Sequence, residues 1–185
     1  MTGIPPYAEL RCLSNFSFLR GASKPEELVE RAQALGYTAL ALTDECSLAG
    51  IVRAHVAAKE QGLKLLVGSQ FQVQSDAPFT LVVLAINLNG YGNLCEFITR
   101  LRRTAPKGTY HLTLKSISAD ALADCLVIAV PQRGSTQAQM DSVARWLLLH
   151  FMGRCWLGVE QLRLMDDEMR LHRLRQSSEL TAVPL

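Results

Sequence analysis

The sequence predicts an α/β fold in which seven strands alternate with helices, and three observations indicate this class. Short apolar runs typical of buried strands alternate from end to end with segments of helical periodicity. Gly and Pro mark the joints between these segments. The 185 residues are 49% hydrophobic, which suits one compact domain, residues 1–185, with a sizeable core. Helices between strands imply parallel crossovers, so the sheet either closes as a barrel or stays open and doubly wound.

The first helix has clear boundary signals. A strand is expected at about 7–12, and after it Ser23-Lys24-Pro25-Glu26 has the pattern of a capping box with Pro at the first helical position. The helix should run to Leu35, where Gly36 can end it in a left-handed conformation. A buried strand is expected next, at 38–43.

The remaining elements follow the same alternation. Gly62 should end a helix at 47–61, and a short exposed extension at 71–74 should follow the next strand. The other expected strands lie at 63–68, 79–86, 125–130 and 155–159, the other helices at 93–104, 137–151 and 166–177, with turns at 87–93 and an irregular basic stretch at 105–120. Residues 181–185 resemble the start of a seventh strand, so we expect a fragment of a longer protein.

Composition favours a cytoplasmic protein without a membrane segment. No apolar run reaches the roughly 18 residues needed to span a bilayer. The first six residues lack the basic and apolar blocks of a signal peptide. The net charge of +2 is too small to require a nucleic-acid partner.

The cysteines and histidines show no metal-binding or catalytic spacing. The five cysteines form no C-x-x-C pair, which favours buried reduced thiols over disulfides or a zinc ribbon. The four histidines, His55, His111, His150 and His172, are expected to be surface or packed residues. No nucleophile elbow, dinucleotide fingerprint or P-loop is present, so no catalytic residue is assigned.

Two basic clusters and two tryptophans have structural and functional interpretations. The first cluster contains Arg100, Arg102, Arg103 and Lys107, and the second contains Arg163, Arg170, Arg173 and Arg175. Each is expected to be a solvated helix face, with a phosphate-binding or partner-binding strip as the alternative. Trp146 and Trp156 lie in apolar surroundings, which favours core packing over base stacking.

Asp44 is the candidate functional residue, because it follows a buried strand at the edge where α/β barrels build active sites. With Glu45 it could bind a hard divalent cation, provided that other loops supply further ligands. The alternative is a structural role in which Asp44 caps the helix that starts near Ser47.

A long stretch of residues resembles a known family. The matching segments are Tyr7–Ser23, Pro25–Ala32, Leu40–Glu45, Gly68–Phe71, Leu81–Ala85, Gly90–Leu94 and Gly153–Leu157. Together they resemble the N-terminal polymerase-and-histidinol-phosphatase (PHP) domain of bacterial C-family DNA polymerases, and most of all its error-prone branch. The resemblance implies a distorted seven-stranded (β/α) barrel of PHP type, truncated at the C-terminal end.

The resemblance also implies a degenerate metal site. The positions at which metal-binding members carry ligands are Arg11, Leu13, Lys24, Asp44, Glu45, Gln70 and Thr80 in this sequence. Of these, Asp44 alone retains the family residue, and the last two family ligands would lie beyond Leu185. Because Arg11 and Lys24 carry fixed positive charge, we expect them to repel a divalent ion or to pair with Asp44 and Glu45.

We therefore interpret the chain as the PHP domain of an error-prone polymerase active in damage-induced translesion synthesis and DNA repair. The resemblance implies that the parent is a nucleotidyltransferase using Mg, whereas this fragment needs no cofactor and serves as a scaffold or docking module. Its expected partners are downstream polymerase domains, DNA through the parent protein, and other translesion-synthesis proteins. The alternative is a residual metal-dependent phosphoesterase or 3′–5′ exonuclease.

Overall fold

The computed structural model describes residues 6–185 and contains two compact units, one ending at Gln70 and one starting at Phe71. The prediction of a single domain stays a prediction. The expected lack of a signal peptide concerns the start of the chain, and residues 1–5 lie outside the described residues.

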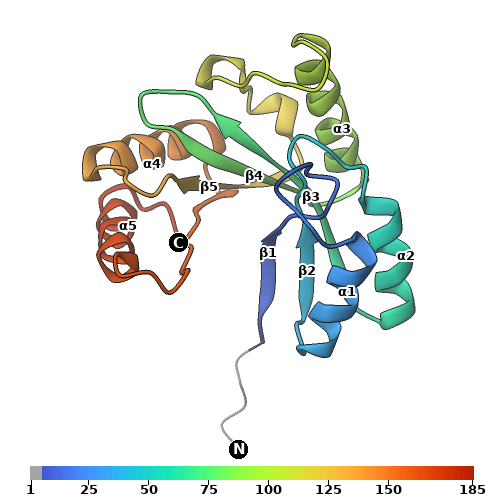
Figure 1. The fold of residues 1–185 in the computed structure, drawn as a ribbon. Coiled ribbons are helices and arrows are strands. Elements are labelled where there is room, and N and C mark those ends of the chain that lie inside the picture. Colours follow the sequence, from blue (N-terminus) through green and yellow to red (C-terminus); the bar gives the residue numbers. More distant parts are fainter. Residues whose placement is uncertain (1–5) are drawn as a thin grey trace, which may run out of the picture. The chain divides into compact units, whose positions relative to one another are not determined.

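The first unit is a parallel sheet covered by two helices. Its elements are β1 (Ala8–Cys12), α1 (Pro25–Ala34), β2 (Ala39–Leu42), α2 (Ile51–Gln61) and the first part of β3 (Lys64–Val73). β2 pairs in parallel with both β1 and β3, and all four of its residues are buried. Figure 1 shows α1 and α2 side by side along these strands. Their apolar faces form the core with β2 through residues such as Val29, Leu40 and Ala54.

The helix boundaries in this unit follow their local hydrogen bonds. The N-cap of α1 is Lys24, one residue later than the sequence pattern indicates, and its amide donates to Glu27 Oε2 at 2.8 Å. Pro25 is the first helical residue, as predicted. α2 begins at Ile51 and not at 47, because Cys46 N and Ser47 N still donate to the middle of β3, at Gln70 O and Ser69 Oγ.

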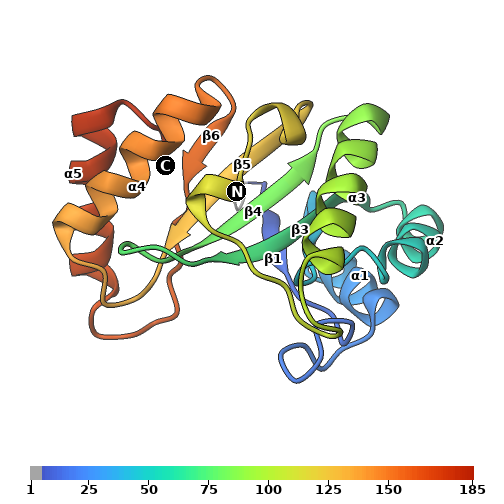
Figure 2. The same ribbon diagram turned by 90° about the horizontal axis from the view of Figure 1, so that it is seen from above.

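The second unit combines antiparallel and parallel pairing. Its elements are β4 (Phe79–Ala85), α3 (Leu88–Arg103), the 3₁₀ turns η1 (Leu114–Ser116) and η2 (Asp120–Leu122), β5 (Cys125–Pro131), α4 (Gln137–Phe151), β6 (Cys155–Leu157) and α5 (Asp167–Thr181). β4 pairs antiparallel with β5, and β5 pairs in parallel with β6. Figure 2 shows α4 and α5 on one side of β4 and β5, with α3 on the other.

The strand predictions need three corrections. The described residues contain six strands, not seven, because Thr181 ends α5 and Leu157 N bonds the carbonyl of Pro184 without a seventh strand forming. The all-parallel prediction is wrong for β4, which pairs antiparallel with β5. Only residues 74–78 join β3 to β4, which is too short for the dozen or more residues of a parallel crossover, so the chain reverses direction before β4. The extension at 71–74 is exposed on one face only, since Phe71 and Val73 belong to β3 and are 0% and 2% exposed, whereas Gln72 is half-buried and Gln74 exposed.

The turn predicted at 87–93 is also wrong, because α3 starts at Leu88. Asn87 caps this helix by accepting a hydrogen bond from Gly90 N at 2.9 Å. Gly90 fits because the helix passes close to another backbone: a Cβ at this position would lie 2.0 Å from the carbonyl oxygen of Asp124. Gly90, which resembles part of a turn in the sequence, therefore permits close packing inside a helix.

Candidate functional site

The candidate site is the carboxylate of Asp44, which follows β2 and is 1% exposed. Its Oδ1 accepts hydrogen bonds from Ser14 N at 2.8 Å and from Ser17 Oγ at 2.7 Å. Its Oδ2 accepts one from Ser14 Oγ at 2.6 Å. Three donors thus converge on both oxygens of one buried carboxylate, and all three belong to the loop between β1 and α1.

The loop that carries these donors is itself closed by backbone hydrogen bonds. Ser14 O accepts from Ser17 N, and Ser17 O accepts from both Arg20 N and Gly21 N, each at 2.9 Å. Gly21 lies so close to Ser14 that a Cβ at residue 21 would be 1.9 Å from the Ser14 carbonyl oxygen. This folding aims the hydroxyls of Ser14 and Ser17 inward at Asp44.

The backbone of Asp44 is hydrogen-bonded to the middle of β3 as well. Its carbonyl oxygen accepts from Ser69 Oγ at 2.7 Å and from Gln70 N at 3.3 Å. Ser69, like Ser14, is fully buried. Asp44 therefore lies at the centre of a hydrogen-bonded polar layer that links the first loop, the end of β2 and the middle of β3.

The structural alternative given for Asp44, a cap on the following helix, is wrong. α2 begins with Gly50 as its N-cap and has no side-chain cap bond. Asp44 has a structural role of another kind, because it organises the loop at 13–23. Sequence spacing could not show this, since its partners Ser14 and Ser17 lie 30 and 27 residues away along the chain.

The charged residues around this layer have hydrogen-bond and ion-pair partners of their own. Glu45 forms an ion pair with Arg20, a residue that sequence reasoning did not select. Arg11 Nε donates to Gln70 Oε1 at 2.7 Å. Lys24 is exposed and N-caps α1. The carboxylate of Asp44 accepts its hydrogen bonds from one amide and two hydroxyls, whereas the sequence predicts Arg11 or Lys24 as its partner.

The other two predicted positions have ordinary surroundings. Leu13 is half-buried in the first unit. Thr80 belongs to the second unit, where its hydroxyl donates to Gln72 Oε1 at 3.2 Å. Among residues 6–185, no group of three or more His, Cys, Asp or Glu side chains is placed to hold a metal ion. The residues present at these positions do not fit a metal centre of the family type.

Cys12 lies beside the polar layer but is poorly suited to nucleophilic or ligand chemistry. Burial, with the negative charges of Glu9 and Asp44, raises the pKa of the Cys12 thiol to about 11. The thiolate is the reactive form, so this residue is neutral and weakly reactive near pH 7.

The remaining cysteine and histidine predictions are confirmed in most respects. All five cysteines are free thiols, of which Cys12 and Cys95 are half-buried and the others buried. His150 packs against Trp146, and the other three histidines are exposed. Trp146 and Trp156 are both half-buried, so neither is a fully enclosed core residue.

The two basic clusters differ from each other. In the first, Arg100 lies over the Phe97 ring and Arg102 over the Tyr110 ring, with 5.4 and 5.9 Å from guanidinium carbon to ring centroid, while Arg103 and Lys107 are exposed. In the second, Arg170 is 5% exposed and donates to the carbonyls of Pro131 and Gln132. The prediction of a solvated face is therefore wrong for Arg170, which holds α5 against the end of β5.

A family model for the PHP domain matches residues 9–148. The chain belongs to the PHP domain family. It is 53% identical to the error-prone DNA polymerase of Dechloromonas aromatica, over 98% of this chain and 18% of that protein, and 51% identical to the one of Pseudomonas aeruginosa, over 91% and 16%. The chain thus spans less than a fifth of the length of these relatives.

Two solved structures show the same fold at low sequence identity. One is an amidohydrolase from Chromobacterium violaceum, with a TM-score of 0.71 and 15% identity over 95% of this chain and 84% of that one. The other, from Bifidobacterium adolescentis, is named as a candidate metal-dependent phosphoesterase, with a TM-score of 0.69 and 16% identity over 97% and 85%. At such identities the likeness concerns the fold. No helix among residues 6–185 is long and apolar enough to cross a membrane.

Proposed function

We propose that this PHP domain serves within an error-prone DNA polymerase as a metal-site-degenerate scaffold or docking module. The observation that supports the proposal is the hydrogen bonding of Asp44. A carboxylate that is 1% exposed and accepts three protein hydrogen bonds is committed to holding the loop at 13–23. Its chemistry here is structural.

The proposal extends to the parent protein through similarity alone. The matches to error-prone DNA polymerases cover nearly all of this chain, and they support a parent that is a DNA-directed nucleotidyltransferase using Mg ions, with downstream polymerase domains and DNA as partners. Damage-induced translesion synthesis, DNA repair, contacts with other translesion proteins and a cytoplasmic location belong to the same proposal. So does a barrel form for the complete fold.

Metal retention tests the proposal. The purified chain is incubated with zinc and manganese, desalted and subjected to elemental analysis, with Asp44→Ala as the comparison. We expect no retained metal in either protein. Stoichiometric metal that disappears in Asp44→Ala would contradict the scaffold role and favour a metal-dependent phosphoesterase or 3′–5′ exonuclease.

A revertant adds a second arm. A family histidine restored at position 11 by Arg11→His removes one positive charge but supplies only one of several missing ligands. We expect this single variant to retain no metal, because a metal site needs several convergent ligands. Tight metal binding by Arg11→His would overturn the account of the degenerate site.

A further inference from the structure

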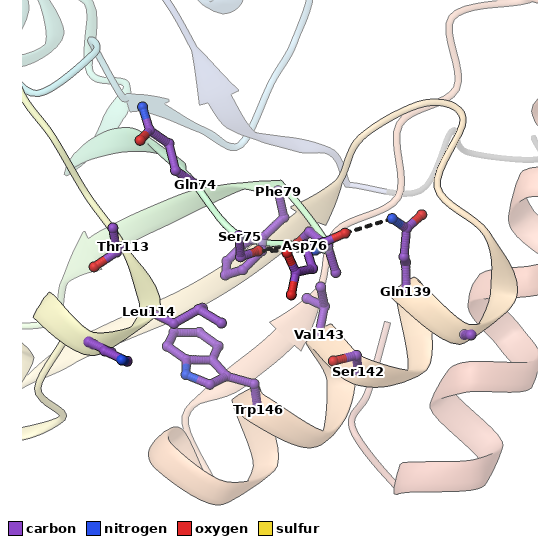
Figure 3. A pocket seen from close by; sticks show the side chains of 13 residues that line it. Gln74, Ser75, Asp76, Phe79, Thr113, Leu114, Gln139, Ser142, Val143 and Trp146 are labelled. Atoms are coloured by element: carbon purple, nitrogen blue, oxygen red, sulfur yellow. Dashed lines mark hydrogen bonds between the residues drawn. The ribbon is translucent and has the colours of Figure 1, made fainter.

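The second unit contains a groove of about 590 Å³ whose lining includes no residue of the Asp44 site. It lies between the connection at 74–78, the turn η1 and the first half of α4 (Figure 3). Phe79, Leu114, Val143 and Trp146 line it with apolar surface, and Lys115 and Ser142 stand among its polar residues. A volume of this size is typical of small-ligand sites.

The walls of the groove are fixed by hydrogen bonds. Gln139 Nε2 donates to Asp76 O at 2.7 Å, which ties α4 to the connection at 74–78 (Figure 3). Ser75 Oγ donates to Ala77 O at 2.7 Å within that connection. On the η1 side, Gln74 N donates to Leu112 O at 2.9 Å. The groove is therefore preformed, and a ligand would not have to order it.

Trp146 gives the groove a specific chemical character. Its ring packs against Phe79, with centroids 5.4 Å apart, and stacks on His150 at 5.2 Å. Its indole N–H donates to no group in the part of the chain that the structure describes. The groove thus offers a held aromatic ring together with an available donor, which suits a planar heteroaromatic ligand carrying acceptor atoms.

The chain segment that leads from the end of α3 to the η1 wall is strongly basic. Residues 97–119 contain Arg100, Arg102, Arg103, Lys107 and Lys115 and no Asp or Glu. Lys115 is exposed at the groove itself, and Arg103 and Lys107 are exposed on the same segment. The one carboxylate among the lining residues is that of Asp76. Positive charge spread along a segment in this way complements a continuous polyanion.

We propose that this groove binds single-stranded DNA, with one base against Trp146 and an adjoining phosphate on Lys115, while the basic segment that leads to η1 attracts the rest of the strand. Aromatic contact with bases and electrostatic contact with phosphates are the two terms that single-strand binders combine. An acidic peptide with apolar anchors is the competing occupant. A nucleotide is favoured because one unit combines a flat ring for Trp146, acceptor atoms for its indole N–H and a phosphate for Lys115. The choice of DNA over RNA rests on the proposed function, whereas the inference of base and phosphate contacts rests on the chemistry of the groove.

The test is the binding of oligo(dT) of about 12 nucleotides to the 185-residue chain. Trp156→Phe leaves Trp146 as the only tryptophan, so its emission reports contact with a base directly. Lys115→Ala removes the proposed phosphate contact. Lys59→Ala is the matched control. Lys59 is exposed on α2, and its substitution removes the same charge at a position far along the sequence from the basic segment.

We expect saturable binding that quenches Trp146 emission. Lys115→Ala should lower the slope of log affinity against log salt by about 0.7, the value for one lost single-strand phosphate contact, and Lys59→Ala should leave it unchanged. Trp146→Phe keeps an aromatic ring in the core but removes the indole N–H and part of the stacking surface. It should weaken binding by at least about threefold.

Three results would overturn the proposal: no oligonucleotide binding, binding without a change in Trp146 emission, or equal effects of Lys115→Ala and Lys59→Ala. An acidic apolar peptide that binds where oligo(dT) does not would also overturn it and assign the groove to a protein partner. Binding of the matching uridine oligonucleotide in preference to oligo(dT) would contradict only the choice of DNA over RNA. Metal retention is a separate readout, so failure here and failure of the scaffold proposal are distinguishable.

Discussion

The hydroxyl of Ser14 donates a 2.6 Å hydrogen bond to Oδ2 of Asp44, and both residues are buried. The contact joins the loop after β1 to the end of β2. An acidic residue at the expected catalytic edge of the fold therefore has a structural role.

Ser14→Ala should destabilise the protein by about 2 kcal/mol, because a buried carboxylate loses a charge-assisted hydrogen bond. Asp44→Asn should cost about 3 kcal/mol, since the amide nitrogen would face hydroxyl or amide donors. Urea unfolding measures both. The double variant should lose less unfolding free energy than the sum of the two single losses, because the residues contact each other. Ser23→Ala is the control in the same loop and should change stability by less than about 0.5 kcal/mol; a loss as large as that of Ser14→Ala would contradict a specific role for Ser14.

Gly21→Ala should disrupt the loop that presents Ser14 and Ser17. The added Cβ would lie 1.9 Å from the Ser14 carbonyl oxygen, a backbone atom that cannot move without displacing the serine donors. We expect a loss of about 3 kcal/mol in the free energy of unfolding.

The matched control for Gly21 is Gly92→Ala on α3. Nothing lies within 4 Å of a Cβ at this position, which is helical and exposed, so alanine should stabilise the helix by up to about 1 kcal/mol. Equal effects of the two substitutions would show that the close approach at Gly21 is relaxed in solution.

Arg133 should make stability depend on acid pH. It donates to the carboxylates of Asp166 and Asp167, and these hydrogen bonds lower the pKa of both groups. A carboxyl whose pKa is lower in the folded than in the unfolded state adds stability above the ordinary Asp pKa of about 3.9. This stability is lost as the pH falls toward the pKa of the folded state. The urea midpoints of wild type and Arg133→Met should therefore differ at pH 7 and converge below about pH 4. A constant difference, as expected for the exposed control Arg31→Met, would exclude the ion pairs as its cause.

The cysteines should differ in alkylation rate. Burial is the main cause that raises the pKa of Cys12 and of Cys125 to about 11, so both thiols are protonated at pH 8. Iodoacetamide should modify them far more slowly in the native protein than in urea, as followed by peptide mass spectrometry. Rapid native modification of Cys125 would indicate that β5 opens or that the thiol is not enclosed.

Local signals in the sequence predict the bounds of α4 well. It begins at the predicted residue 137, where Thr136 and Gln139 form a reciprocal capping box, and it ends at the predicted residue 151. α3 starts earlier than predicted, because Gly90 serves a close backbone approach that no local pattern shows. The antiparallel pairing of β4 and β5 is likewise a tertiary result.

The candidate site shows the same limit. Its place at the end of β2 is predictable from the position of Asp44 after an apolar run. Its chemistry is not, because the hydroxyls that bind the carboxylate come from Ser14 and Ser17, two common residues in a polar loop. The groove at Trp146 is also hidden in the sequence, since its lining comes from three separate segments of the second unit.

The most direct test of the structural role of Asp44 is urea unfolding of the wild type and of Asp44→Asn, with and without excess Mn²⁺ or Zn²⁺. A ligand that binds the native state raises the free energy of unfolding according to its concentration and affinity. We predict that Asp44→Asn is less stable than wild type and that neither metal changes the unfolding midpoint of either protein. A metal-dependent increase in wild-type stability that Asp44→Asn abolishes would contradict the account and identify Asp44 as a metal ligand.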